Sequence, residues 1–593
     1  MSTAARIFVF GILVLMTLVG NAQNSKSASA DLESRRKQLN ALLDEQWQYT
    51  LRTSPEFASI LGDKRYSDRV SDVSERAVKA DLAKAKEFLA KFEKVDTTGF
   101  PEQEALNKTL MVRNLKEQLE NARFNTWQMP VNQFFGIHID LPQYSALYAF
   151  DTVKDYEDYI ARLKQYPRQM EDTAANMRKG LATRLVPPKF LLEKVAKQAA
   201  DLADDKPEDS PFAQPLQKFP KTFSEAEKTR LRNALLAAIR DVVLPAYVKF
   251  AAFIRDEYAP KGRTEPGLWS LPDGPARYAA AAKSLTTTTV PPERIHQIGL
   301  EQVAMIEAQE LEIAKKLGYA DLKAFRAAVK VDPKLKAQSR ESIIQRYRQF
   351  TDAMYKELPK LFGRLPKAKV EIMAVEPFRE KEAGGAQYFQ GTPDGSRAGI
   401  VRVNTYDHAN KLIISDESTA YHEGVPGHHM QISIAQELPT LPPFRQQAGY
   451  TAYVEGWALY SERLGKEIGF YQDPYSDYGR LEDENWRAIR LVVDTGVHLK
   501  KWSRQQIVDY MREHSSADEA SIQAETDRYI AWPGQALAYK MGQLKIIELR
   551  ERAQKALGPR FDIRAFHDEV LGAGALPLDV LEQRIDAWIA KQK

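Results

Sequence analysis

Apolar residues recur three and four positions apart along most of the chain, which is the spacing of helices with one buried face. An early run is Leu39, Leu42, Leu43 and Trp47. The same spacing returns at 156–163, 231–253 and 298–317. We find no repeat at a fixed period of about 20 to 50 residues, which argues against a solenoid. The pattern predicts a mainly α architecture.

One region departs from helical spacing. Val370, Ile372 and Ala374 alternate with other residues, and the β-branched residues Ile400, Val401 and Val403 follow a Pro-Asp-Gly turn at 393–395. Alternation beside such a turn predicts a small antiparallel β-hairpin. Its exposed edge could hold an extended peptide by backbone hydrogen bonds, although a hairpin that only covers the core has the same pattern.

The amino terminus carries a targeting pattern. Arg6 precedes an apolar run at 7–19, and the small residues Gly20 and Ala22 flank Asn21. The run is shorter than the roughly 20 residues that a spanning helix needs, so a cleaved signal peptide is favoured over an uncleaved anchor. We expect residues 1–22 to be removed, and the mature protein to be periplasmic or secreted without stable membrane insertion.

Composition indicates approximate boundaries within the rest of the chain. A polar, proline-bearing stretch at 204–221 is typical of a linker. We therefore expect an N-terminal helical region at 23–203 and a central helical region at 222–368. The remaining region, 369–593, contains the predicted hairpin and all the chemical motifs described below.

Composition narrows the classes of function. The 593 residues are 44% hydrophobic and 28% charged, as in a globular protein with a large core. The formal net charge of +4 is too small for the field of a nucleic-acid-binding protein. The absence of cysteine excludes a thiol nucleophile, an iron–sulfur cluster and a disulfide scaffold. No G-x-S-x-G sequence indicates a serine hydrolase.

Three of the nine histidines fall within the segment 421–429, which reads YHEGVPGHH. His422 and Glu423 open the H-E-x-x-H zinc motif, in which two imidazoles bind the ion and the glutamate serves as general base. The closing position, 426, is proline, and the next imidazoles are His428 and His429.

A regular helix cannot bring either histidine to the same ion as His422. A residue six positions on points about 120° away, and one seven positions on lies about 10.5 Å along the axis. Pro426 and Gly427 must distort the helix. A bulge of two residues would return His428 to the place of the usual second ligand, so we predict His428 and leave His429 as the alternative. The other histidine would then bind substrate or a carboxylate.

A third ligand is expected from the largely apolar helix at 453–462. Glu455 lies within it, and a buried carboxylate is costly unless it is paired or bound to metal. Two neutral imidazoles leave one protein position for an anion in a catalytic zinc site. We predict Glu455 as the third ligand. Glu462, two turns on, is the alternative, either as a ligand or as a partner of one.

These motifs together resemble a known family. The matching residues are His422-Glu423-x-x-Pro426-Gly427-His428-His429, Glu455-Gly456-Trp457-Ala458-Leu459-Tyr460, Arg397 and Asn404, Asp494-Thr495-Gly496-x-His498, and the segment 532–542. They resemble the bacterial family catalogued as domain of unknown function 885, which is similar to zinc peptidases of the gluzincin type. The resemblance covers most of the mature chain and implies a mostly helical fold with a deep active-site cleft.

Peptide hydrolysis also needs a donor for the oxyanion, usually a Tyr hydroxyl or a His N–H. Tyr529, Tyr539 and His498 are the candidates, and core packing is the alternative for each. For substrate binding we predict Arg397, Asn404 and His429.

The sequence predicts an exported Zn²⁺-dependent peptidase that hydrolyses short peptides, with Glu423 as general base. A zinc amidase acting on a cell-wall peptide is one alternative. A periplasmic peptide-binding protein with an inactive metal site is another, although the intact Glu423 argues against it. The sequence leaves open whether cleavage is terminal or internal. A terminal carboxylate could be bound by Arg397, Arg490 or Arg528.

Overall fold

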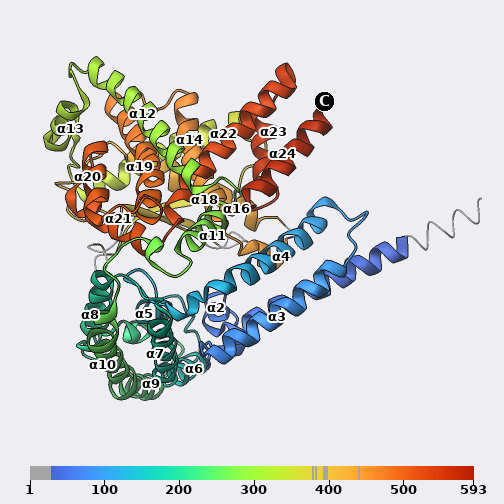
Figure 1. Cartoon of the computed structure of the whole chain (residues 1–593), viewed down its shortest axis with the longest axis vertical. Coiled ribbons are helices and arrows are strands. Elements are labelled where there is room, and N and C mark those ends of the chain that lie inside the picture. The colour runs from blue at the N-terminus through green and yellow to red at the C-terminus, as the bar shows by residue number, and fades with distance from the viewer. Residues whose placement is uncertain (1–28, 377–379, 381–383, 392–397, 439–440) are drawn as a thin grey trace, which may run out of the picture. The chain divides into compact units, whose positions relative to one another are not determined.

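The computed structural model describes residues 29–376, 380, 384–391, 398–438 and 441–593 (Figure 1). The expected signal peptide, Arg397 and the turn at 393–395 lie outside these residues. No helix in the described part of the chain is both long and apolar enough to cross a membrane.

The prediction of a mainly α protein is confirmed. The first helix covers 29–53. It is followed by α2 (Pro55–Ile60), α3 (Glu75–Lys94), α4 (Glu102–Asn121), α5 (Ile137–Ser145), α6 (Val153–Leu163), α7 (Tyr166–Thr183), α8 (Lys189–Ala203), α9 (Glu225–Ala238), α10 (Leu244–Ala252), α11 (Gly274–Thr286), α12 (Pro292–Lys316), α13 (Leu322–Val331) and α14 (Arg340–Leu361). The helices beyond the sheet are α15 (Asp416–Glu423), α16 (His428–Gln436), α17 (Pro443–Gln446), α18 (Thr451–Glu467), α19 (Pro474–His498), α20 (Arg504–His514), α21 (Glu519–Ala531), α22 (Ala538–Leu557), α23 (Ile563–Leu571) and α24 (Leu578–Gln592).

The chain forms two compact units that interleave along the sequence. Unit 1 contains the described residues up to Trp127, together with Asp140–Asn176 and Ala200–Phe250. Unit 2 contains Gln128–Ile139, Met177–Ala199 and Ala251–Lys593.

Unit 1 is built from paired helices, and α3 lies beside α4 (Figure 1). The helix α6 begins with a capping box in which Thr152 and Asp155 bond each other's backbone. The stretch 204–221, expected to be a linker, lies inside this unit. It contains the short 3₁₀ helix η4 (Pro211–Gln217), in which Phe212 is fully buried and the carbonyl of Pro215 accepts a hydrogen bond from Tyr156.

The core of unit 2 lies between its longest helices. Two of them, α12 and α19, pack along each other, and α18 packs against α22 in the same way. Gly456 and Gly542 meet at the second crossing, where a Cβ at Gly456 would lie 2.4 Å from the backbone of Gly542. The two small residues therefore let the backbones of α18 and α22 approach closely.

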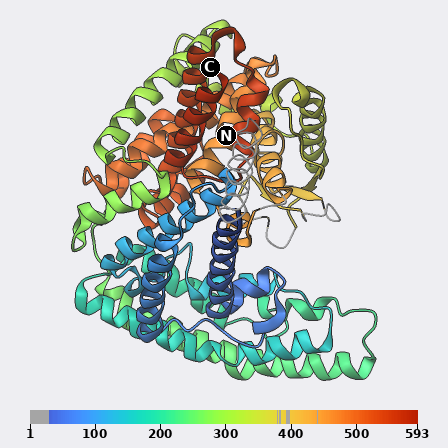
Figure 2. The ribbon, with the colours of Figure 1, turned by 90° about the vertical axis from the view of Figure 1, so that its right-hand side faces the viewer.

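A three-stranded sheet belongs to unit 2 and appears as short arrows among its helices (Figure 2). Its strands are β1 (Val370–Ala374), β2 (Ala386–Phe389) and β3 (Gly399–Val403), in the order β1-β3-β2. The predicted antiparallel hairpin is wrong in its pairing. β1 and β3 run parallel, with Val370 opposite Gly399, and the antiparallel partner of β3 is β2. Alternation identifies a strand but not its direction, and the connection from β1 to β3 is long enough for a parallel crossover.

Candidate metal centre

The histidine segment folds as two helices separated by a turn. α15 ends at Glu423 and α16 begins at His428. In the turn, the N–H of Gly427 donates to the carbonyl of Tyr421 at 3.0 Å. A Cβ at Gly427 would lie 2.0 Å from the carbonyl oxygen of His422, so only glycine fits this close approach. The predicted two-residue bulge is therefore wrong, because the helix breaks completely and restarts.

This turn is tied to α18. The carbonyl of Pro426 accepts a hydrogen bond from Trp457 Nε1 at 2.9 Å and another from Ser461 Oγ at 3.3 Å. The same helix carries Glu455 and Glu462, seven positions apart and therefore on one face. Both carboxylates meet His422.

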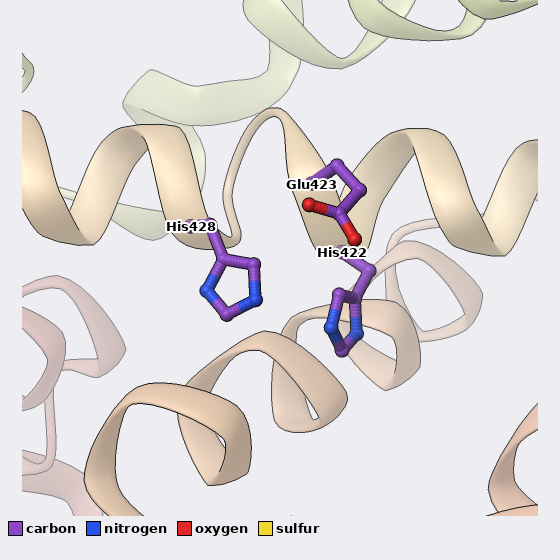
Figure 3. A group of neighbouring side chains, drawn as sticks. All are labelled: His422, Glu423 and His428. Atoms are coloured by element: carbon purple, nitrogen blue, oxygen red, sulfur yellow. The ribbon is translucent and has the colours of Figure 1, made fainter. Parts of the chain in front are cut away.

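The break brings His422 and His428 together. Figure 3 shows His422 and Glu423 at the end of one helix and His428 across the turn. Each of the three residues offers a ligand atom, and these atoms lie within 4.8 Å of one another. Glu455 Oε2 lies 3.6 Å from His422 Nε2 and 3.5 Å from His428 Nε2. Ligands of one tetrahedral zinc, with bonds of about 2.0–2.1 Å, are separated by roughly 3.5 Å. The group could hold a metal ion.

Glu462 fixes the ring of His422 from behind. Its Oε1 lies 2.7 Å from His422 Nδ1, and its side chain is 1% exposed. Because Nδ1 is bonded to this carboxylate, Nε2 is the ring nitrogen that faces Glu455. Of the two acids that the sequence offered, Glu455 lies within 3.6 Å of both His422 and His428, whereas Glu462 contacts the other ring nitrogen of His422.

The charges in this group favour an ionised Glu455. Burial would raise its pKa, but hydrogen bonds and charge from His422 and His428 hold the pKa well below its usual range. Burial also lowers the pKa of His422, yet hydrogen bonds to Glu455 and Glu462 raise it to about 10. The site therefore attracts a positive charge.

A pocket of about 350 Å³ opens beside these residues. It is lined by Gln387, Tyr388, His422, Glu423, His428, Ile432, Val454, Glu455, Arg487, Arg490 and Tyr539. Glu423 Oε2 accepts a hydrogen bond from the backbone N–H of Tyr388 at 2.8 Å. β2, which the sequence analysis missed, thus borders the pocket and orients Glu423.

His429, predicted to bind substrate, is not among the residues that line the pocket. It is fully buried, and its ring nitrogens lie 3.1 Å from the Tyr388 hydroxyl and 3.1 Å from the Ala368 carbonyl. Burial lowers its pKa to about 4. His429 therefore supports β2 as a neutral core residue.

Of the three candidates for the oxyanion donor, Tyr539 alone lines the pocket. The Tyr529 hydroxyl is buried and donates to Glu525 at 2.6 Å. His498 is also buried, where Nδ1 accepts from the N–H of Leu268 and Nε2 donates to the Tyr529 carbonyl. The geometry leaves Tyr529 and His498 in structural roles.

Asn404, predicted to bind substrate, instead organises the loop after β3. Its side chain donates to the carbonyl of Glu380 at 2.7 Å and accepts from the N–H of Tyr406 at 2.9 Å. Arg397 lies outside the described residues. Arg487 and Tyr388 were missed as pocket residues; the signal available for Arg487 was its position three residues before Arg490 in a largely apolar helical run.

The solved structures that resemble the chain include two bacterial proteins. One is described as that of a "putative lipoprotein" from Colwellia psychrerythraea, with 31% identity and a TM-score of 0.88, covering 94% of this chain and 100% of that one. The other, a "putative lipoprotein of unknown function" from Shewanella oneidensis, has 18% identity and a TM-score of 0.71, covering 92% and 98%. The second likeness concerns the fold alone.

No curated protein matches the chain. A family model described as a bacterial protein of unknown function, DUF885, matches residues 55–585. That range covers nearly the whole described chain and contains the entire candidate metal centre. The protein belongs to the DUF885 family.

Proposed function

We propose that this protein is an exported zinc-dependent peptidase that hydrolyses short peptides. The observation that carries the proposal is the position of Glu455 Oε2, 3.5–3.6 Å from the Nε2 atoms of both His422 and His428. Export is supported by the predicted signal peptide and by the relative from Colwellia psychrerythraea, which is described as a lipoprotein.

The residues present fit a zinc ion. Two imidazole nitrogens and one carboxylate, with the remaining position open to a pocket, form the usual donor set of a catalytic zinc site. The Glu462–His422 contact provides the carboxylate support that zinc-binding histidines usually have. When bound, zinc would polarise the scissile carbonyl and lower the pKa of water.

Glu423 is the proposed general base. It lines the pocket beside the two histidines, and the N–H of Tyr388 holds one of its carboxylate oxygens. Glu423 would accept a proton from the attacking water and then donate it to the leaving amine. Its orientation beside His422 and His428 supports a proton transfer at this end of the pocket.

Tyr539 is the proposed oxyanion donor. Its hydroxyl would donate to the oxygen of the scissile carbonyl as negative charge develops there. Arg528 Nη2 lies 3.4 Å from this hydroxyl and favours the orientation of its proton toward the pocket. The deep cleft implied by the family resemblance would contain this pocket.

The test combines metal analysis with one matched pair of variants. Purified protein should contain about one zinc per chain and lose hydrolysis of a mixed peptide library when a chelator removes the metal. Glu423→Gln should retain zinc but lose at least about a hundredfold in turnover. Glu312→Gln, an exposed change in α12, is the control. Full activity of metal-free protein would refute the proposal.

A further inference from the structure

Two arginines in the pocket have no role in the steps described above. Arg487 and Arg490 are three positions apart on α19 and therefore share one face of the helix. Their side chains are 17% and 8% exposed. Charged side chains are rarely this buried unless a partner neutralises them.

Arg490 is held rigidly and leaves one donor unused. Its Nε donates to the Tyr529 hydroxyl at 3.0 Å, and its Nη2 donates to Glu525 Oε2 at 3.0 Å. Its Nη1 is buried and has no hydrogen-bond partner among the described residues. The ring of Tyr539 stacks 4.5 Å from the guanidinium carbon. The guanidinium is thus oriented before any ligand enters.

The acids around the two arginines do not balance their charge. Glu525 is shared, because its Oε1 also accepts from Arg528 Nη1 at 3.1 Å. Arg487 donates to the backbone carbonyl of Asp483 at 2.9 Å and pairs with the Asp483 carboxylate at 3.5 Å, so two acids serve three arginines. Its Nε has no partner in the described part of the chain. The acids lining the pocket, Glu423 and Glu455, already serve the proposed reaction.

A carboxylate is the ligand that suits this arrangement. A buried guanidinium N–H without a partner costs free energy, which an entering anion would recover. The planar arginine fork matches the two oxygens of a carboxylate better than a lysine ammonium does. Every peptide substrate carries one such group at its C-terminus.

We propose that Arg490, assisted by Arg487, forms a subsite for the C-terminal carboxylate of the peptide. This inference rests on the proposed peptidase function and assigns it to cleavage near the carboxyl end. A sphere with the pocket's volume of about 350 Å³ would be roughly 9 Å across, a length that two to three extended residues span at about 3.5 Å each. The bound carboxylate therefore lies within a few residues of the scissile bond.

The test compares peptides that differ only at the C-terminus. N-acetylated hexapeptides are made as free acids and as amides, and kcat/KM is measured for zinc-loaded wild-type protein with product identification by mass spectrometry. We expect the acids to be preferred by about tenfold to a hundredfold, as for a charge-assisted hydrogen bond. Products should lack residues from the carboxyl end only.

Arg490→Gln should abolish the preference for acid over amide, and Arg490→Lys should restore part of it. The ratio of the two rates does not depend on how much of the variant is folded, so a loss of stability cannot imitate the result. Arg512→Gln, an exposed change in α20, should keep the full preference. Equal rates on acid and amide by the wild-type protein, with internal cleavage, would overturn the proposal.

An acidic side chain carries the same chemistry as the terminal carboxylate, so a second peptide set places Glu at each position of the amidated hexapeptide. Cleavage of amides only next to Glu, lost in Arg490→Gln, would overturn the terminal assignment in favour of an acidic side chain.

A binding measurement separates this inference from the peptidase proposal. Calorimetry with Glu423→Gln and N-acetylated tripeptides, as acid and amide, reports the subsite without turnover. Preferential binding of the acid supports the subsite even if the wild-type protein hydrolyses nothing, which would refute the peptidase proposal alone. Hydrolysis without preference in either assay would refute the subsite alone.

Discussion

At the scale of single residues, the two adjacent histidines lie in different surroundings. His428 Nε2 lies 3.5 Å from Glu455 Oε2, whereas His429 is enclosed by Tyr388 and Ala368. His428→Ala should therefore lower zinc affinity by about a hundredfold or more, because even the loss of a supporting contact costs tenfold to a hundredfold. His429→Ala should keep zinc and reduce stability. Zinc content after dialysis against a competing chelator measures both variants side by side.

The opposite pattern of zinc loss would contradict this prediction. If His429→Ala emptied the site while His428→Ala left it filled, the assignment of the second ligand would be wrong. A thermal unfolding scan of each variant shows whether any loss of zinc follows from unfolding.

Tyr539 and Tyr529 provide a second contrast between residues. Tyr539 lines the pocket, whereas the Tyr529 hydroxyl is bound to Glu525. Tyr539→Phe should lower kcat by about a hundredfold to a thousandfold with unchanged zinc content, as expected for an oxyanion donor. Tyr529→Phe should change kcat by less than about tenfold and cost about 1 kcal/mol of stability through its lost hydrogen bonds. Normal turnover by Tyr539→Phe would return this tyrosine to a packing role.

Some of these roles could be predicted from the sequence and others could not. His422, His428 and Glu455 were predicted because a metal site restricts residue type, spacing and burial together. The structural partners of His429 and Asn404 could not be predicted, because the Ala368 and Glu380 carbonyls are backbone groups far away in the sequence. A backbone carbonyl leaves no signal in residue identity, so buried structural histidines resemble functional ones.

At the scale of elements, proline and glycine predicted a distortion but not its form. Pro426 cannot donate a hydrogen bond and Gly427 permits a close backbone approach, which a bulge and a complete break both require. The break is fixed by Trp457 and Ser461 of α18, which hold the Pro426 carbonyl. The predicted sheet also lacked one strand. β2 has only four residues, and an alternation this short cannot be recognised in the sequence.

Asp494, which anchors the turn before α22, provides a prediction about how stability depends on pH. Asp494 of α19 accepts hydrogen bonds from the Tyr278 hydroxyl at 2.6 Å and from the N–H of Gly534 at 3.1 Å. It thereby anchors the segment that leads to Tyr539. Burial raises the pKa of Asp494 to about 7, although these two hydrogen bonds act to lower it.

The direction in which pH changes the folding stability follows from the protons that Asp494 binds in each state. An unfolded Asp titrates near pH 3.9, so between about pH 4 and 7 the folded state holds a proton that the unfolded state has lost. This residue therefore costs stability as pH rises through that window. In Asp494→Asn the cost is removed, and the free energy of unfolding relative to wild type should rise by about 3 kcal/mol between pH 5 and pH 8.

Denaturant unfolding of both proteins at the two pH values measures this change. The comparison cancels any hydrogen bond that the asparagine makes less well, because that cost does not vary with pH. Asp509→Asn, at an exposed position of α20, should show no comparable change. A difference between variant and wild type that stays constant from pH 5 to pH 8 would show that Asp494 is ionised throughout.

At the scale of the whole molecule, the candidate metal centre belongs entirely to unit 2, but that unit does not coincide with one stretch of sequence. Residues 128–139 and 177–199 belong to it as well. Gln133 donates to the Asp527 carbonyl at 3.0 Å, and Lys194 is paired with the Asp527 carboxylate. Composition along the chain marks polar stretches such as 204–221, but it cannot show which distant helices share a core, so boundaries drawn on the sequence cut across both units.

A substitution at Leu191 of α8 tests whether residues 177–199 share the core of unit 2. It is fully buried in one cluster with Ile306 of α12 and with Ile489 and Val492 of α19. Leu191→Ala should cost about 2–5 kcal/mol of stability, as for other large-to-small changes in a packed core. Native-state hydrogen exchange should show faster exchange in α12 and α19, more than a hundred residues away in the sequence, because the cavity weakens the core that these helices share.

Leu147→Ala, in unit 1 at a residue that is 52% exposed, should change stability by no more than about 0.5 kcal/mol. Faster exchange confined to unit 1 in the Leu191 variant would mean that this part of the chain does not share the core of the unit that contains the candidate metal centre.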